Sequence, residues 1–132
     1  MTFSGISYLA VVIAAVAAFA FGAVWYMALG KAWMAAVGMK EEPKPAPAPF
    51  IIAFFALLVM AWALAGLIGH LGEITVMRSL ISAFFVWLGF IATTMIVNHR
   101  FQKSTWSLTF IDAGHWLGVA LVMALVIGLI GG

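Results

Sequence analysis

The feature that constrains this chain most is a set of long apolar stretches without charge. No Asp, Glu, Lys, Arg or His occurs from Ser7 to Leu29, from Phe50 to Gly69, or from Ser79 to Val97. An α-helix needs roughly 20 mainly apolar residues to cross the hydrocarbon core of a bilayer. With 132 residues that are 67% hydrophobic and 8% charged, a soluble fold could not bury so much apolar surface. The sequence therefore predicts an integral membrane protein.

We predict an all-α fold, a membrane four-helix bundle with short loops that forms one domain over residues 1–132. A cleaved signal peptide is the competing interpretation of the first stretch. It is disfavoured because no Lys or Arg precedes Ser7, and because the apolar run exceeds the roughly 7–15 residues of a signal peptide. The expected spans cover about residues 7–29, 50–70, 75–98 and 113–131.

A proline-rich segment separates the first two spans. Lys40 to Pro49 reads KEEPKPAPAP, and proline at every second position forbids helix and favours an extended polyproline conformation. We predict a solvated, semi-rigid strap, with a docking segment for a partner as the alternative. The preceding stretch, Lys31 to Met39, is either a short interfacial helix or an extension of the first span.

The distribution of Lys and Arg predicts the orientation. Cytoplasmic loops are enriched in these residues. Arg78 is the basic residue of one side, whereas loops one and three share the other side. We therefore expect both termini outside and loops one and three in the cytoplasm, consistent with a bacterial inner membrane. The basic residues of those two loops are Lys31, Lys40, Lys44, Arg100 and Lys103.

Most aromatic residues near the predicted cytoplasmic ends are explained by an interfacial belt, since their amphipathic rings favour the headgroup level. Trp62 and Trp87 are different, because each is expected roughly 12 Å from the outer end of its helix. At a shared depth the two rings could meet, through packing or as walls of an apolar ligand pocket. The belt residues are Trp25, Tyr26, Trp33, Trp106 and Trp116.

Small residues recur every four positions on three of the predicted spans. Such stripes let helix backbones approach closely in lipid. They predict helix packing without deciding whether the partner is the same chain or a second copy. The stripe residues are Ala10, Ala14, Ala18 and Gly22; Ala61, Ala65 and Gly69; Gly114 and Gly118; and Ala120, Ala124 and Gly128.

The ionisable residues gather in two rims, one on each side of the membrane. No carboxylate is expected at mid-membrane, which argues against a proton-coupled exporter and a side-chain proton wire. Asp112 is interpreted as the N-terminal cap of the last helix. Arg78, Arg100 and Lys103 suit lipid phosphates or another ligand. The remaining rim residues are His70 and Glu73 on the outer side, and His99 and His115 on the cytoplasmic side.

Two chemical classes of site find little support in the sequence. His70 with Glu73, and Asp112 with His115, would each share a helical face, but a metal site needs further ligands that no spacing supplies. The chain has no cysteine, and its Ser and Thr residues lack a paired His and acid at recognisable spacing. We therefore predict neither a metal nor another cofactor. Nucleic acid is not an expected partner, because no basic stripe with interleaved aromatics is present.

Several motifs resemble a known family. The chain reads Gly22-Ala-Val-Trp-Tyr26, Gly30-Lys-Ala-Trp-Met34, Trp87-Leu-Gly-Phe90 and Phe110-Ile-Asp112. This pattern is similar to a small, mainly bacterial membrane-protein family known as domain of unknown function 1761. The resemblance covers nearly the whole chain and implies a four-helix membrane domain with an uncleaved first helix. It implies no activity, and the short connection from Met27 to Leu29 departs from the family's usual longer one.

Three functions remain open, and the first fits the lack of polar mid-membrane residues best. The chain could be a structural or accessory component that forms a homo-oligomer or joins a larger membrane complex. It could instead bind or carry a small apolar molecule or lipid. The third hypothesis is an intramembrane enzyme that uses Asp112, His115 and His99 as acid–base groups.

Overall fold

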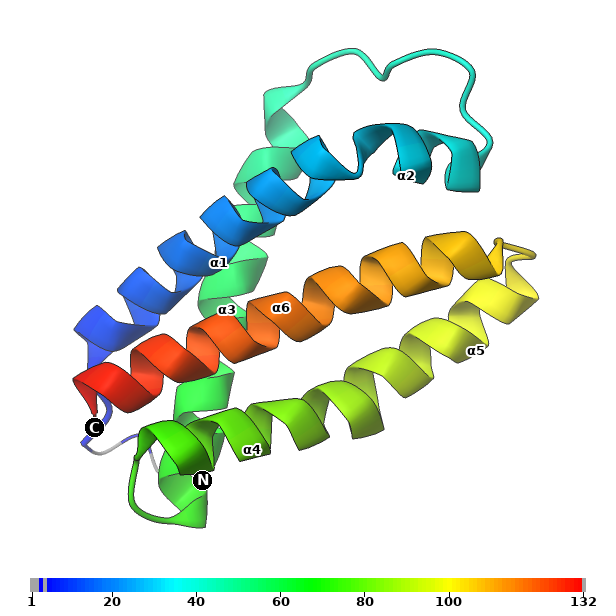
Figure 1. Cartoon of the computed structure of the whole chain (residues 1–132). Coiled ribbons are helices and arrows are strands. Elements are labelled where there is room, and N and C mark those ends of the chain that lie inside the picture. The colour runs from blue at the N-terminus through cyan, green and yellow to red at the C-terminus, as the bar shows by residue number, and fades with distance from the viewer. Residues whose placement is uncertain (1–2, 4, 132) are drawn as a thin grey trace.

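The chain is built from helices, which Figure 1 colours from blue at the N-terminus to red at the C-terminus. The structure is a computed structural model and describes residues 3 and 5–131. No strand occurs among these residues. The predicted domain also includes residues 1, 2, 4 and 132, which lie outside the described part of the chain. The elements are α1 (Tyr8–Ala28), α2 (Gly30–Val37), α3 (Pro47–Leu71), α4 (Val76–Val86), the π-helix η1 (Trp87–Ala92), α5 (Thr93–Phe101) and α6 (Trp106–Ile130).

Four helical segments are long and apolar enough to cross a membrane. They are α1, α3, α6 and the continuous run of α4, η1 and α5 from Val76 to Phe101. The predicted fold class, an all-α membrane protein with four spanning helices, is confirmed. The run from Val76 to Phe101, which is the third span in the sequence, has the smallest buried share, 11% against 28–33% for the other three.

Side-chain caps begin three of the helices. The hydroxyl oxygens of Ser7, Thr75 and Thr105 accept the backbone N–H of Ala10, Arg78 and Leu108, respectively. Such caps satisfy N–H groups that a first helical turn leaves without partners. The fourth long helix, α3, begins instead with proline in its first turn, where a missing N–H costs nothing.

The interpretation of Asp112 as a helix cap is wrong. The last helix begins at Trp106, and Asp112 lies in its second turn. A threonine hydroxyl caps a helix as a carboxylate does, and neither glycine nor proline interrupts the sequence between Thr105 and Asp112. The helix therefore begins at the first available cap.

The segment after α1 forms a separate short helix. Leu29 interrupts the helical geometry between α1 and α2. Helix α2 is terminated by Gly38, whose φ of 90° is the left-handed conformation that glycine tolerates. The Thr105 hydroxyl donates to the Ala36 carbonyl over 2.9 Å and ties α2 to the start of α6. The proline-rich strap then arches from α2 to α3 without regular structure over residues 40–46 (Figure 1). The prediction is wrong for Pro47 to Pro49, which begin α3, because the first turn of a helix accepts proline.

Helix α6 is the centre of the arrangement. It lies along α1 on one side and α4 on the other, while α3 packs mainly against α1 and crosses behind α6 (Figure 1). The core is built largely from alanine and aliphatic residues, so the helices approach closely. Its fully buried members include Ala14, Ala15, Ala18, Ala61, Ala83, Val119, Met123, Ala124 and Ile127.

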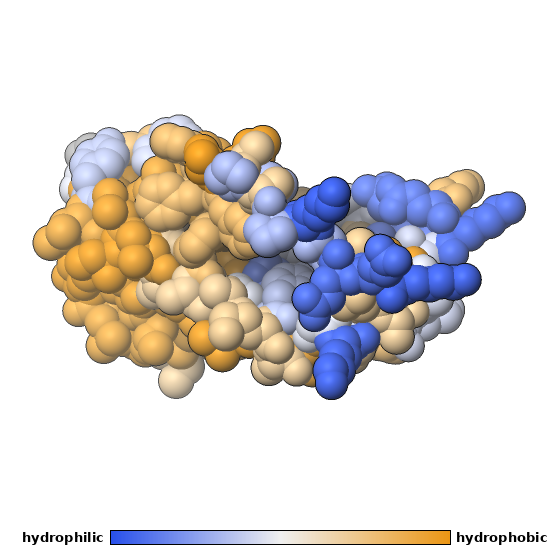
Figure 2. Space-filling model, turned by 90° about the horizontal axis from the view of Figure 1, so that it is seen from above, coloured by the Kyte–Doolittle hydropathy of each residue, from blue (hydrophilic) through white to orange (hydrophobic). Residues whose placement is uncertain are grey.

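The two ends of the bundle differ in polarity. The start of α1, the end of α6 and the α3–α4 turn lie at one end, while α2, the strap and the α5–α6 turn lie at the other (Figure 1). Figure 2 shows strongly hydrophilic side chains gathered toward one end, beside a mainly hydrophobic surface. Exposed Lys31, Lys40, Lys44 and Lys103 belong to α2, the strap and the α5–α6 turn.

Candidate functional site

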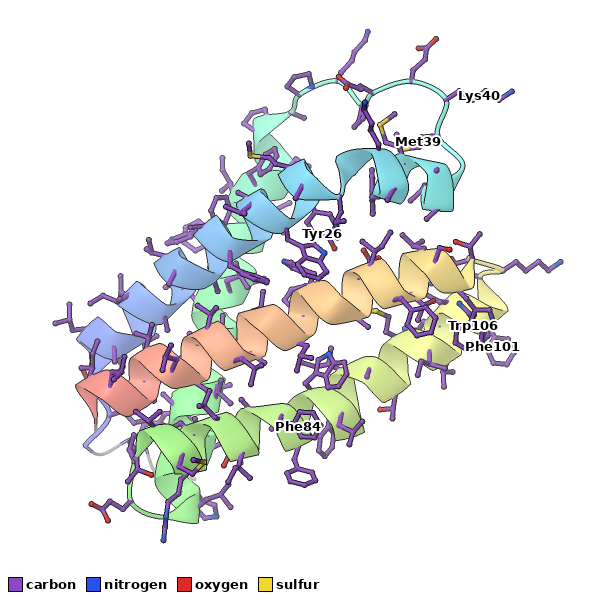
Figure 3. The ribbon with its side chains drawn as sticks, viewed as in Figure 1. Tyr26, Met39, Lys40, Phe84, Phe101 and Trp106 are labelled. Carbon is purple, nitrogen blue, oxygen red and sulfur yellow. The ribbon has the colours of Figure 1, made fainter. Side chains whose placement is uncertain are left out.

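Three side chains from two helices hold one short segment of α6. The Tyr26 hydroxyl donates to the Asp112 carboxylate over 2.8 Å. The indole N–H groups of Trp25 and Trp87 donate to the backbone carbonyls of Ile111 and Ala113 over 3.1 and 2.9 Å. Figure 3 shows Tyr26 between α1 and α6. A backbone carbonyl has two lone pairs, so Ile111 and Ala113 can accept these indole N–H groups and still keep the hydrogen bonds of the helix.

Glycines on both helices make room for this contact. A Cβ on Gly114 would lie 3.0 Å from the Trp25 ring, and a Cβ on Gly118 would lie 2.1 Å from the Phe21 ring. Aromatic side chains of α1 thus rest on glycine positions of α6. We call the contact formed by Phe21, Gly22, Trp25 and Tyr26 with residues 111–118 the α1–α6 interface.

His115 lies inside the α1–α6 interface and is 9% exposed. Its ring is 4.8 Å from the Tyr26 ring and 4.8 Å from the Trp116 ring, measured between centroids. A Cβ on Gly22 would come within 2.8 Å of its Nε2 atom. Its Nδ1 atom is buried and has no hydrogen-bond partner among the described residues. The imidazole therefore acts here mainly as a packed ring.

A second polar cluster lies where α5 turns into α6. His99 Nδ1 and the Thr109 hydroxyl lie 2.8 Å apart, and Arg100 Nη2 donates to the same hydroxyl. Arg100 also donates to the Ser104 carbonyl over 3.3 Å. Its guanidinium lies 3.6 Å from the centre of the Trp106 ring, a cation–π distance.

Comparison with known proteins identifies the family. The family model described as "Protein of unknown function (DUF1761)" matches residues 9–128. The chain belongs to the DUF1761 family. No curated protein and no solved structure matches it. The resemblance in the sequence is thereby confirmed, and four residues of its motifs, Trp25, Tyr26, Trp87 and Asp112, meet at α6 although they are far apart in the sequence.

This DUF1761 chain has an open hollow of about 400 Å³ on the side of its third span. Phe90, Ile91 and Met95 form its apolar end, and Asn98, His99 and Gln102 form its polar end, with Thr94 between them. We call this surface the α5 hollow. From Phe90 to Gln102 the helix rises about 18 Å at 1.5 Å per residue. The hollow thus changes from apolar to polar along the axis of a membrane-spanning helix.

The π-helix η1 provides the apolar end of the α5 hollow. Insertions of π-helix are uncommon and are frequent at functional sites. The hydroxyls of Thr93 and Thr94 donate to the carbonyls of Gly89 and Phe90 over 2.8 and 2.5 Å. These bonds supply extra donors where the backbone departs from the α pattern. Trp87, at the start of η1, reaches α6 while Phe90 stays 73% exposed.

A smaller hollow lies at the opposite end of the bundle. It measures about 170 Å³ and is lined by Glu73 and Arg78 together with Ile68, Leu71 and Gly72. His70 and Glu73 do not share a helical face, because α3 ends at Leu71. Arg78 lies close to Gly72, where a Cβ would come within 2.6 Å of the guanidinium. One acid and one base thus line the same small space.

The acid–base residues of the enzyme hypothesis do not gather at one place. Asp112 and His115 lie together on α6, whereas His99 bonds to Thr109. Among residues 3 and 5–131, no three His, Asp or Glu side chains are close enough to hold a metal ion. These positions form two separate polar contacts between helices.

Trp62 and Trp87 have different partners. Trp62 is 40% exposed and stacks on Phe3, with 4.2 Å between ring centres and 7° between planes. Trp87 packs against the core and donates to α6. Within the described part of the chain the two rings form no aromatic pair, so the structure gives no pocket with both as walls.

The small-residue stripes lie against other parts of the same chain. Ala14, Ala18 and Ala61 are 0% exposed, and Ala65 is 2% exposed. A Cβ on Gly128 would come within 2.6 Å of the Val76 Cα atom, and one on Gly69 would lie 3.7 Å from Ile74. These positions are used inside the single chain.

Sequence patterns miss the most specific contacts. The belt interpretation of Trp25 and Tyr26 concerns only their depth, and nothing in it indicates that both donate to α6. Thr109 is 2% exposed yet looks like any threonine in the sequence. The sequence feature that points to these contacts is the family resemblance, because its motifs include Trp25, Tyr26, Trp87 and Asp112.

Proposed function

We propose that this DUF1761 chain binds one amphiphilic, lipid-like molecule in the α5 hollow. The observation that carries the proposal is the change from apolar to polar lining along about 18 Å of one helix. Half of a bilayer's hydrocarbon core is about 15 Å thick. An acyl chain would lie against Phe90, Ile91 and Met95, while a headgroup would reach Asn98, His99 and Gln102.

The position of the hollow supports the same occupant. Residues in a lipid-facing span are usually apolar, because unsatisfied polar groups are costly in hydrocarbon. Asn98 and Gln102 are exposed at the polar end, and no hydrogen bond from either side chain occurs among the described residues. A headgroup at the membrane surface supplies donors and acceptors to these amides.

A matched pair of tryptophan substitutions tests the proposal. Thr94→Trp places a bulky ring inside the α5 hollow, whereas Val97→Trp places it on the same helix outside the hollow lining. Both positions are exposed, so both variants should fold. Native mass spectrometry from lipid nanodiscs should find one retained lipid on the wild type and Val97→Trp, and none on Thr94→Trp. Equal retention by all three proteins would refute the proposal.

A second candidate is a structural or accessory component that self-associates. It is favoured by the low buried share of the third span, 11%. One side of α4 and the start of η1 carries Met77, Ile81, Phe85 and Leu88, each at least 44% exposed. A two-fold axis along the membrane normal would bring these four side chains against the same side chains of a second copy. A larger membrane complex is the alternative outcome for this face.

Self-association has its own test. Phe85→Ala with Leu88→Ala should convert a dimer to a monomer in native mass spectrometry, whereas Val12→Ala with Val16→Ala on α1 should not. Both pairs are exposed in the single chain, so the comparison isolates the face formed by α4 and the start of η1. A wild type that is monomeric in bilayer-derived samples would remove this candidate.

We also propose an orientation, with α2, the strap and the α5–α6 turn in the cytoplasm of a bacterial inner membrane and both termini outside. The support is the excess of Lys and Arg at that end. A C-terminal reporter that is active only outside the cytoplasm should be active. A C-terminal reporter that works only in the cytoplasm should be silent, and activity from it would contradict the orientation.

A further inference from the structure

The charges beside the α5 hollow are not balanced locally. Arg100 follows the lining residue His99, and Lys103 follows the lining residue Gln102. The acceptors that the structure gives Arg100 are the carbonyls of Ser104 and Thr105 and the Thr109 hydroxyl, all of them neutral. The nearest acid in the sequence, Asp112, accepts from Tyr26 instead. Two positive charges therefore lie next to the polar end of the hollow.

Arg100 is held in place before any ligand arrives. Its guanidinium stacks on Trp106, and its Nη2 atom is used by three acceptors of the α5–α6 turn. Its Nε atom is buried without a partner among the described residues. A guanidinium fixed in this way loses little conformational freedom on meeting an anion. Its hydrogen bonds among the described residues all come from Nη2 and go to neutral acceptors, so its positive charge remains available to a phosphate.

The opposite end of the bundle gives an internal comparison. Arg78 lines the smaller hollow together with Glu73, so a carboxylate accompanies the guanidinium there. No acidic side chain lines the α5 hollow. An anion is therefore favoured at the α5 end and opposed by Glu73 at the α4 end.

From these observations we infer that the amphiphile of the α5 hollow is an anionic phospholipid, whose phosphate is recognised by Arg100 and Lys103. The inference rests on the proposed function, since it names the class of molecule that the hollow selects. Asn98 and Gln102 bind the polar part of the headgroup, and the apolar end receives one acyl chain. A zwitterionic lipid presents the same phosphate but adds an ammonium group that these two cations repel.

The experiment measures which lipid remains bound. The protein is placed in nanodiscs of equal parts phosphatidylglycerol and phosphatidylcholine and released for native mass spectrometry. The retained lipid that Thr94→Trp removes should be enriched in phosphatidylglycerol over the bulk mixture. Lys103→Gln should lower that enrichment about fivefold, as expected for one basic residue at a membrane surface.

Three further variants separate charge from structure. Arg100→Gln should lower the enrichment about as much as Lys103→Gln, whereas Arg100→Lys keeps the charge and should retain most of it. Arg78→Gln removes the same charge at the other end and should leave the enrichment unchanged. If Arg100→Gln fails to fold, exposed Lys103 still carries the test.

The outcomes distinguish the two proposals. One retained lipid with the bulk composition would overturn the anionic preference and leave the proposed function standing. Retention that Thr94→Trp does not change would overturn the proposed function itself. An equal effect of Arg78→Gln and Lys103→Gln would show a general charge effect and would contradict a site at the α5 hollow.

Discussion

The α1–α6 interface and the α5 hollow lie toward the same end of the bundle and are built in opposite ways. In the interface, aromatic rings rest on glycines, and Trp25 and Tyr26 donate hydrogen bonds to one segment of α6. Along α5 no residue is buried. Apolar burial alone gives little preference for another helix over lipid. The comparison indicates that close fit and directed hydrogen bonds decide which faces of these helices pair.

Substituting glycines in the two regions should give the largest contrast. Gly118→Leu forces the Phe21 ring to move, because even a Cβ would lie 2.1 Å from it. We expect a loss of about 1–3 kcal/mol in the free energy of unfolding. Gly89→Leu adds the same side chain where nothing lies within 4 Å, and should change stability by less than about 1 kcal/mol. Thermal unfolding in one detergent compares them, and equal losses would contradict the contrast.

The Tyr26–Asp112 hydrogen bond should contribute the next largest effect. Tyr26→Phe and Asp112→Ala each remove one partner of a bond between half-buried side chains. A double-mutant cycle should give a coupling of about 1–2 kcal/mol, within the range found for side chains in direct contact. Chemical unfolding of the four proteins measures this coupling. A value near zero would mean that the contact adds nothing to the interface.

Substitutions of Trp87 and Trp62 should differ in their cost to stability, by less than the two preceding comparisons. Trp87→Phe removes the donor to the Ala113 carbonyl and should cost about 1 kcal/mol. Trp62→Phe keeps a ring that can stack on Phe3 and should cost less than about 0.5 kcal/mol. Unfolding midpoints under identical conditions decide the order, and a larger loss for Trp62→Phe would reverse our assignment.

The smallest effect is expected on the exposed side of α5. Ile96 is 40% exposed and is not among the residues of the α5 hollow. Ile96→Ala should change the free energy of unfolding by less than about 0.5 kcal/mol, since lipid replaces the lost contacts. A loss comparable to that of Gly118→Leu would show that another helix covers this face.

The sequence predicts the coarse fold well, because each apolar run is long enough to span a bilayer and charges fall between the runs. It misplaces Asp112, since a span prediction cannot tell where a helix begins before it enters the membrane. The helix starts at Thr105 and brings the carboxylate to Tyr26. The small-residue pattern identifies Gly114 and Gly118 but not the rings that fill their space.

The α5 hollow itself could not be predicted from sequence. Thr94, Met95 and Asn98 carry no motif, and they share one face of the regular helix α5, while Phe90 and Ile91 extend the same surface from the π segment. The apolar sequence predicts a continuous α-helix here and does not indicate a π-helix at Trp87–Ala92. At the polar end, Asn98 and His99 belong to the cytoplasmic rim that the sequence indicates, whereas Gln102 is not among the residues expected from the sequence.

The most direct test of the account is photo-crosslinking with a phospholipid that carries a diazirine on its acyl chain. The labelled positions are then mapped by tandem mass spectrometry on protein in nanodiscs. We predict adducts concentrated on Phe90, Ile91 and Met95 of the α5 hollow, and lost in Thr94→Trp. Adducts spread evenly over exposed residues such as Phe55, Phe85 and Phe110 would contradict a specific lipid site in this chain.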